Sequence, residues 1–355
     1  MKILYVSSKY NRGKPELGYM PQHYNIYDTL VKINGGINEV LYFSIDEKLK
    51  ELGREEMNKR LLETIDKEKP KLVFFVSGSD KIKKEALREI TNKNEIITLN
   101  WYADDHWKFH NYSKYWTPFY DWVATTDPDS IPKYHKRGLN NVILSQWGCN
   151  HFLYRPLNLE KMYDVTFIGA AHGNRRKIIK KLKDAGISVK CWGRGWPAGM
   201  VSQEDMLKIW SQSKINLNFT KSSGILWKEL ATIFFHRRYD GKIRPVNPRY
   251  WLDNIKVMWI SMFANQIKGR NMELPGCRTF TLSEYVKHLE DYYEIGKEID
   301  CFRSIPELIN KIKYYLAHEE EREAIAQAGY NRTISDHTWE KRFNKIFEVA
   351  GLAKE

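Results

Sequence analysis

Residues 163–186, "YDVTFIGAAHGNRRKIIKKLKDAG", open with an apolar run, continue through a loop with two glycines, and end in a helical pattern that stops at Gly186. A short apolar strand, a Gly-containing loop and a helix form the start of a βαβ unit. Such units build parallel sheets that helices cover on both faces. The stretch therefore predicts that a doubly wound α/β domain begins here.

The same alternation of apolar runs and helical patterns fills the rest of the chain. In the first part, apolar runs lie at residues 2–8, 39–45, 71–78, 95–102, 121–127 and 141–148. After residue 186 we expect strands in "ISVKCWG", "KINLNFT", "RTFTLSE" and "EIDCF", a helical pair over 304–329 and a terminal helix over 336–352. The aromatic and basic run at 224–262 predicts an inserted or helical segment.

The chain has 355 residues, which is long for a single hydrophobic core. The alternating pattern gives way to a loop-like stretch at 149–161, so we place a domain boundary there and expect two doubly wound domains in tandem. Ligands of open parallel sheets bind beyond the carboxyl ends of the strands. Two such domains facing each other would leave a cleft for chemistry on the strand-to-helix loops.

Composition excludes several classes of protein. The four cysteines lie far apart with no C-x-x-C pair, which argues against a disulfide framework or a zinc site. The sequence has no run of about 18 apolar residues, so we expect no membrane span. The opening "MKILYVSSKY" resembles a first strand more than a secretory signal, so we expect a cytoplasmic protein. The net charge of +13 predicts anionic partners. Nucleic acid, anionic lipid and phosphorylated small molecules all qualify.

The loop at 168–177 is the first candidate site. Gly169 and Gly173 allow close approach to the backbone, and the following helix offers free N–H groups at its N-terminus. Arg175 and Lys177 add cations where a helix dipole alone favours carboxylates. The spacing is not G-x-G-x-x-G, so the loop is either an anion site or an ordinary basic first turn.

The second candidate is the stretch "NQIKGRNMELPGCRTFTLSEY" at 265–285. Lys268 and Arg270 would suit a diphosphate, and Glu273 would accept two hydrogen bonds from vicinal sugar hydroxyls. The competing interpretation is a salt-bridge pattern within one helix, which the residues alone favour.

The third candidate is "LNWYADDHWKFH" at 99–110. Asp104 and Asp105 with His106 and His110 could ligate a divalent metal or provide a general base. A helix N-terminus capped by an aspartate, with packed tryptophans, explains the same residues. The aromatic and basic run at 227–251 could stack on bases or sugar rings or pack in a core, and no nucleic-acid module signature is present.

Several ordered motifs then resemble one family. The last third carries "KGRNMELPGC", "SEY", "GKEI", "EER..IA..G" and "HTWEKRF", which together resemble the C-terminal donor domain of CgeB-like (spore maturation protein) glycosyltransferases, with a group 1-type donor domain. "DVTFIGAAHGNRRKII" and "KINLNF" resemble the same family, as do "ADD.W", "YDWVATTD" and "GCN...YRP" in the first half. The resemblance covers most of the chain and is strongest from residue 163 onward.

This resemblance implies the GT-B fold: two Rossmann-like doubly wound domains facing across a cleft. An N-terminal acceptor domain would span 1–155, a donor domain 156–336, and a terminal helix over 337–355 would cross back to the first. The implied activity moves a sugar from a nucleotide-diphosphate-sugar, UDP-sugar foremost, to a hydroxyl of a surface glycan or glycoprotein. It implies no cofactor and no required metal, and retention is favoured over inversion.

The resemblance also implies residue roles. Glu273 matches a ribose-contacting glutamate, and Asn265 stands eight residues earlier, where many relatives have a second glutamate that touches the donor sugar. The implied nucleotide and phosphate ligands are Gly169, His172, Gly173, Arg175, Lys177, Lys268 and Arg270. If the reaction inverts, the candidate bases are Asp105, Asp104 and His106.

Other functions fit the same sequence. A glycosyltransferase that modifies hydroxylated bases in DNA would use the positive charge, and so would a basic nucleic-acid-binding protein without catalysis. A sugar-nucleotide epimerase would share the architecture. For a cytoplasmic protein of this charge we also expect peripheral contact with anionic surfaces.

Overall fold

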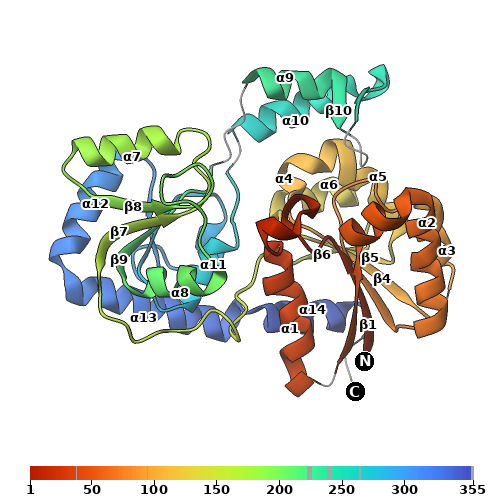
Figure 1. The fold of residues 1–355 in the computed structure, drawn as a ribbon, viewed down its shortest axis with the longest axis horizontal. Coiled ribbons are helices and arrows are strands. Elements are labelled where there is room, and N and C mark those ends of the chain that lie inside the picture. Colours follow the sequence, from red (N-terminus) through yellow and green to blue (C-terminus); the bar gives the residue numbers. More distant parts are fainter. Residues whose placement is uncertain (37, 94, 222–225, 238–241, 264, 353–355) are drawn as a thin grey trace. The chain divides into compact units, whose positions relative to one another are not determined.

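The computed structural model describes residues 1–355 except 37, 94, 222–225, 238–241, 264 and 353–355. The chain forms two compact α/β units (Figure 1). Unit 1 consists of Met1–Gln146, Leu226–Ile260 and Arg342–Glu355, and unit 2 of Trp147–Ile225 and Ser261–Lys341. The boundary predicted at 155/156 thus falls inside unit 2. Of the predicted insertion at 224–262, residues 224, 225 and 238–241 lie outside the described residues.

Unit 1 contains a six-stranded sheet in the order β2-β1-β3-β4-β5-β6, and all its paired strands are parallel. The strands are β1 (Lys2–Ser7), β2 (Glu39–Ser44), β3 (Leu72–Val76), β4 (Ile97–Tyr102), β5 (Trp122–Thr125) and β6 (Val142–Leu144). These are the apolar runs that the sequence predicted as strands. Their near-continuous hydrophobicity follows from burial on both faces.

Helices cover both faces of this sheet. On one face, Val6 and Phe75 pack in a buried cluster with side chains of α2 (Ile45–Glu68) and α3 (Lys84–Thr91). On the other face, the ring of Phe74 lies 5.9 Å from that of Phe343 in α14 (Trp339–Val349). Adjacent strand residues reach opposite faces because successive side chains alternate across a strand. Unit 1 also contains α1 (Asp28–Lys32), α4 (Asp105–Lys108), α5 (Lys114–Trp116) and α6 (Ile131–His135).

Residues 226–260 belong to unit 1 although the segments before and after them belong to unit 2. This insertion contains α9 (Leu226–Phe234), the antiparallel pair β10 (Phe235–Arg237) and β11 (Ile243–Pro245), and most of α10 (Trp251–Phe263). Side-chain contacts join the insertion to the first part of unit 1; in one of them, Lys114 Nζ donates to Asp253 at 2.6 Å. The sequence predicted an inserted or helical segment here, and the described part contains two helices and a strand pair.

Unit 2 contains a five-stranded parallel sheet in the order β13-β12-β9-β7-β8. The strands are β7 (Tyr163–Ile168), β8 (Val189–Trp192), β9 (Ser213–Asn218), β12 (Thr281–Glu284) and β13 (Asp300–Phe302). The helices are α7 (Arg175–Asp184), α8 (Gln203–Ser211), α11 (Arg270–Gly276), α12 (Ile305–Ala317) and α13 (Glu319–Asp336).

Two separate apolar clusters flank this second sheet. Phe167 and Leu217 pack in one cluster with Ile178 of α7 and Ile312 of α12. The other cluster contains side chains of α8 and α11. A parallel sheet with helices on both faces is the predicted doubly wound architecture, and the prediction of fold class is confirmed. Among the described helices, none combines the length and the hydrophobicity that crossing a bilayer requires.

Candidate functional site

The loops after β7 and β8 are joined at the carboxyl edge of the unit 2 sheet. The Ala171 amide donates to the carbonyl of Arg194 at 2.9 Å, and the Trp196 indole donates to the carbonyl of Gly169 at 2.8 Å. Gly193 has φ +121, and a Cβ there would lie 2.5 Å from the Gly169 oxygen. Glycine is therefore required for the two loops to meet this closely.

Arg175 fixes the position of the first loop from within. Its side chain is buried, and its guanidinium donates to the carbonyls of Ala170 at 2.9 Å and Phe219 at 3.1 Å. Burial lowers the pKa of Arg175 to about 10, against the opposing effect of Glu284. Its Nε has no hydrogen-bond acceptor among the described residues. Both Nη atoms of Arg175, a predicted phosphate ligand, thus donate to backbone carbonyls.

Cations from two loops and from the first turn of α7 act on His172. His172 is exposed at the surface, yet desolvation by its neighbours, followed by the charges of Arg175, Lys268 and Arg194, lowers the pKa of this imidazole to about 4. The positive charge gathered here suits an anion site, because a bound anion would relieve the mutual repulsion of the cations. The structure therefore brings together His172, Arg175 and Lys268 of the predicted set, and adds Arg194. Gly173, with φ +63, and Lys177 are exposed and lie in the same segment of the sequence.

The predicted ribose and phosphate ligands of α11 bind each other. Arg270 donates from Nη1 to Glu273 Oε2, and its guanidinium lies 4.6 Å from the centre of the Trp210 ring. Burial opposes the charge on Arg270, but Glu273 outweighs it and raises the pKa of the guanidinium. A Cβ on Gly269 would lie 2.9 Å from Glu273 Oε1, so glycine leaves room beside that oxygen. The salt-bridge interpretation of the sequence therefore holds for this pair.

Asn265 lies beside the ends of β9 and β12. Its amide nitrogen donates to the carbonyl of Tyr285 at 3.2 Å, and the residue forms an isolated bridge with Lys221. Its Oδ1 is buried and has no hydrogen-bond donor among the described residues. Buried polar atoms are usually paired, so a hydroxyl donor of a ligand would satisfy this oxygen.

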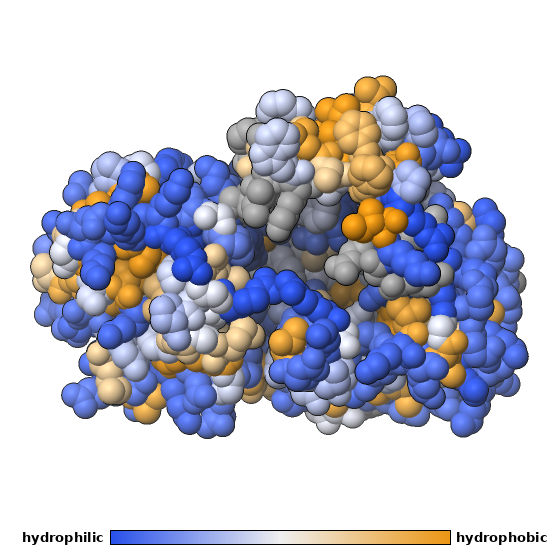
Figure 2. All heavy atoms as spheres, turned by 45° about the horizontal axis from the view of Figure 1, so that its top comes forward, coloured by the Kyte–Doolittle hydropathy of each residue, from blue (hydrophilic) through white to orange (hydrophobic). Residues whose placement is uncertain are grey.

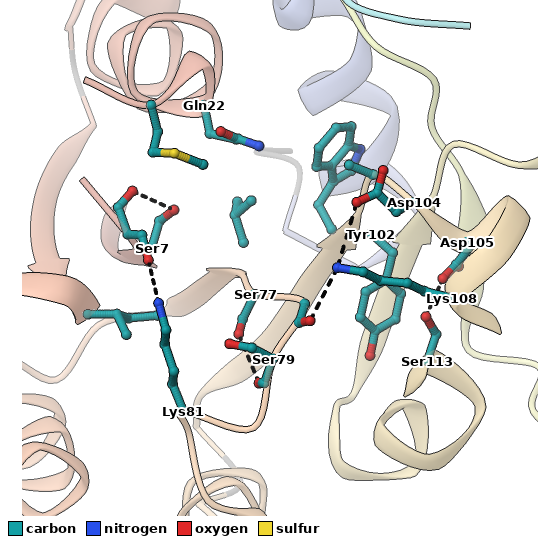
Figure 3. A pocket seen from close by; sticks show the side chains of 17 residues that line it. Ser7, Gln22, Ser77, Ser79, Lys81, Tyr102, Asp104, Asp105, Lys108 and Ser113 are labelled. Carbon is teal, nitrogen blue, oxygen red and sulfur yellow. Dashed lines mark hydrogen bonds and ion pairs between the residues drawn. The ribbon is translucent and has the colours of Figure 1, made fainter. Parts of the chain in front are cut away.

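A polar pocket of about 270 Å³ opens at the carboxyl ends of β1, β3 and β4 in unit 1 (Figure 3). Its polar lining is Ser7, Ser8, Gln22, Ser77, Ser79, Lys81, Asp104, Asp105, Lys108 and Ser113. Lys81 donates to the hydroxyl of Ser8 at 3.2 Å, and burial lowers the pKa of this lysine. Hydroxyl, amide, carboxylate and ammonium groups in one pocket can bind a small polyol.

Asp105 is fully buried and its oxygens are already occupied. Oδ1 accepts from the Ser113 hydroxyl and Oδ2 from the Tyr134 hydroxyl at 2.7 Å. Burial raises the pKa of Asp105 to about 6, partly offset by these hydrogen bonds. The carboxylate connects the first turn of α4 to Ser113 and Tyr134 through hydrogen bonds, so Asp105 stabilises this wall of the pocket.

Asp104 is the more accessible carboxylate. Its side chain is 36% exposed, and its Oδ2 lies 3.7 Å from Lys108 Nζ. His106 is not part of the pocket lining. The pocket thus includes two of the three predicted base candidates. Within the described part of the chain, no three His, Cys, Asp or Glu side chains form a group suited to a metal ion.

Sequence reasoning missed Lys81, Lys108 and Arg194. Lys81 follows β3 and Arg194 follows β8, so each lies just beyond a strand end. Reading every strand end for charged residues would have found both. Lys108 lies inside the motif at 99–110, in which only the acidic and histidine residues were candidates from the sequence.

The family comparison matches residues 247–348 to a model described as glycosyl transferase-like. Spore protein CgeB of Bacillus subtilis (strain 168) is 21% identical over 229 residues. That match covers 62% of this chain and spans 65%, just under two thirds, of the length of CgeB.

Solved structures show the same fold over nearly the whole chain. Sucrose-phosphate synthase (tll1590) from Thermosynechococcus elongatus has a TM-score of 0.63 at 11% identity and covers 98% of both chains. Anabaena Alr3699/HepE in complex with UDP has a TM-score of 0.59 at 10% identity and covers 99% of this chain and all of its own. AviGT4, a glycosyltransferase of avilamycin A biosynthesis, has a TM-score of 0.55 at 12% identity, with 98% of each chain covered. The chain has the GT-B fold.

Proposed function

We propose that the protein transfers a sugar from a nucleoside diphosphate sugar, with UDP as the nucleotide, to a hydroxyl of a glycan or glycoprotein. The observation that carries the proposal is the cation cluster of unit 2. The charges of Lys268, Arg194 and Arg175 act together on His172 at the carboxyl edge of a doubly wound sheet. A diphosphate is the ligand that such a cluster at such an edge fits best. The UDP-bound state of the structurally similar HepE supports the choice of nucleotide.

The chemistry follows from the leaving group. As the bond to the sugar breaks, negative charge develops on the nucleoside diphosphate, and fixed cations stabilise it. Lys268 and Arg194 provide this charge in the proposal, so neither a metal nor another cofactor is required. Asn265 Oδ1, a buried acceptor for which the described residues provide no donor, would accept from a donor-sugar hydroxyl.

The acceptor would bind in the unit 1 pocket. Its polar lining suits a hydroxyl-rich molecule. If the reaction inverts, Asp104 is the proposed base, because it is partly exposed whereas Asp105 already accepts two hydroxyls. If it retains, as we favour, the departing phosphate can guide the acceptor, and Asp104 would only orient it.

Nucleotide binding tests the donor site. We expect UDP to raise the melting temperature more than GDP, dTDP or CMP does, because a ligand stabilises the state that binds it. Lys268→Ala should weaken UDP binding roughly tenfold to a hundredfold, the value of a charge-assisted hydrogen bond. Lys180→Ala, an exposed lysine on α7, removes the same charge as a control. No stabilisation by any of the four nucleotides, or equal losses in both variants, would refute the assignment.

Turnover tests the activity itself. A panel of nucleotide sugars is screened for release of the nucleoside diphosphate, with and without candidate glycans and with EDTA. We expect release from a UDP-sugar, faster with the right acceptor and unchanged by EDTA. Binding of UDP without release from any UDP-sugar would leave a nucleotide-binding protein and contradict the transfer.

A further inference from the structure

The insertion of unit 1 carries large apolar side chains in an exposed position. Trp227 is 78% exposed, Leu252 74%, Ile243 72%, Trp259 56% and Phe235 50%. We call these five residues the insertion surface. Figure 2 shows hydrophobic side chains gathered over α9, α10 and the β10–β11 pair, at the top of the view. Single exposed apolar residues are common on soluble proteins, but a cluster of this kind marks an interaction site.

The opposite side of the insertion is held firmly. Asp253 accepts from Lys114 at 2.6 Å and from the Tyr115 hydroxyl at 2.9 Å. Val257 and Met258 of α10 are buried. The inner face is therefore anchored to the body of unit 1, so the exposed residues are not simply an unpacked helix.

Helical periodicity separates the two faces of α10. Leu252, Ile255 and Trp259 follow an i, i+3, i+7 spacing and are exposed, whereas Asn254, Val257 and Met258 are buried. The start of α10 also packs on the end of α9, with the Trp251 and Phe234 rings 5.1 Å apart. The apolar outer face thus belongs to two helices, α9 and α10, that pack against each other.

Positive charge accompanies the apolar surface. Residues 226–260 contain seven Lys or Arg and three Asp or Glu, a formal net charge of +4. Lys242, Arg244, Arg249 and Lys256 are exposed. Of the acidic residues, Asp253 is turned inward to Lys114. Tryptophan and aliphatic side chains bordered by cations are the composition of protein surfaces that lie in the headgroup region of a bilayer.

We propose that the insertion surface docks unit 1 on a bilayer that contains anionic lipids. Trp227, Ile243 and Leu252 would enter the headgroup and acyl boundary, while Lys242 and Lys256 would face lipid phosphates. This inference goes beyond the proposed glycosyl transfer and does not depend on it.

Charge and shape favour a bilayer over other occupants. A symmetric contact with a second copy of the chain would set the same net +4 segment against itself, which repels. Nucleic acid would use the cations and stack on the tryptophans, but it offers nothing for Ile243 and Leu252, which are each more than 70% exposed. An anionic bilayer satisfies both the apolar side chains and the charges.

Vesicle co-sedimentation of the full chain tests the proposal. The probes are vesicles of phosphatidylcholine alone and of phosphatidylcholine mixed with phosphatidylglycerol. We expect binding to the mixed vesicles only, with the bound fraction decreasing as salt is added. For Trp227→Ser/Leu252→Ser, the lipid concentration for half-maximal binding should rise roughly tenfold or more. Lys242→Glu/Lys256→Glu should weaken binding similarly and reduce its salt dependence.

A matched control replaces exposed apolar residues elsewhere. Met162→Ser/Met200→Ser changes unit 2 residues that are 65% and 64% exposed, and should leave lipid binding unchanged. Circular dichroism and thermal melting confirm that all variants fold. Absence of binding to the mixed vesicles, equal binding to neutral ones, or unaltered binding of the serine variant would overturn the proposal. So would a dimer in light scattering that Trp227→Ser/Leu252→Ser converts to a monomer.

Discussion

The Arg270–Glu273 ion pair leads to an asymmetric prediction for two single substitutions. The Glu273 side chain is 5% exposed and that of Arg270 is 32% exposed. In Arg270→Met, the carboxylate stays buried without its cation, and unfolding should become easier by about 3–5 kcal/mol. In Glu273→Gln, the guanidinium keeps its contact with the Trp210 ring and can reach water. We therefore expect a smaller loss of about 1–2 kcal/mol.

The free energy of unfolding in guanidinium chloride, followed by circular dichroism, measures both losses. The double substitution Arg270→Met/Glu273→Gln leaves no unpaired charge, and its loss should fall below that of Arg270→Met alone. Glu204→Gln, which removes the exposed partner of Lys208 on α8, should leave the unfolding midpoint in place. A Glu273→Gln loss as large as that of Arg270→Met, or strict additivity in the double variant, would refute the reasoning.

The same variants separate structural from ligand roles of Glu273. If Glu273 contacts ribose, as the family resemblance implies, Glu273→Gln should weaken UDP binding about tenfold at a temperature where the variant is fully folded. Calorimetric titration with UDP measures this directly. Unchanged affinity would limit Glu273 to holding Arg270.

Three further outcomes are expected. Burial sets the pKa of Asp105 at about 6 instead of 3.8. The contribution of the raised pKa to folding stability is therefore complete below pH 3.8 and is lost as the pH rises through 6. Over this range the free energy of unfolding of the wild type should fall by about 3 kcal/mol relative to that of Asp105→Asn. Denaturation series that show the same difference between the two proteins at every pH would contradict this. Gly193→Ala should cost at least about 3 kcal/mol in the same assay because of its close approach to Gly169, and Gly186→Ala, with open space around its Cβ, about 1 kcal/mol. Asn265→Ala should lower kcat/KM for the UDP-sugar about tenfold with UDP affinity unchanged; a parallel loss of UDP affinity would remove Asn265 from the donor-sugar site.

The sequence predicted the strands of the two sheets because each buried parallel strand is a short apolar run that can be recognised from its own residues. The apolar run at 163–168 and the helix that ends before Gly186 need no distant information, and the structure has β7 and α7 there. The grouping of residues 226–260 with unit 1 is different. It rests on contacts such as Lys114 with Asp253, which are 139 residues apart in the chain, and local patterns carry no trace of them.

The sequence does not reveal how the side chains of the candidate sites differ in burial and in hydrogen bonding. Asp104 and Asp105 are adjacent and chemically identical, yet one is partly exposed and the other fully buried between two hydroxyls. Arg175 belongs to the predicted anion site, and its guanidinium also donates to two backbone carbonyls, which the sequence does not indicate. Charge and spacing indicate where polar chemistry gathers, but acceptors supplied by remote backbone decide which groups stay available.

The path of the chain between its two units has a consequence for how the protein can be made and cut. Because 226–260 and 342–355 return to unit 1, the chain passes from one unit to the other four times. A ribosome that has released the whole unit 1 sheet still has to make the insertion and the segment from residue 342, so unit 1 cannot be completed before unit 2 has been synthesised. For the same reason, no truncation at a single point yields either unit intact. Isolating one would require joining its separate segments into a new chain.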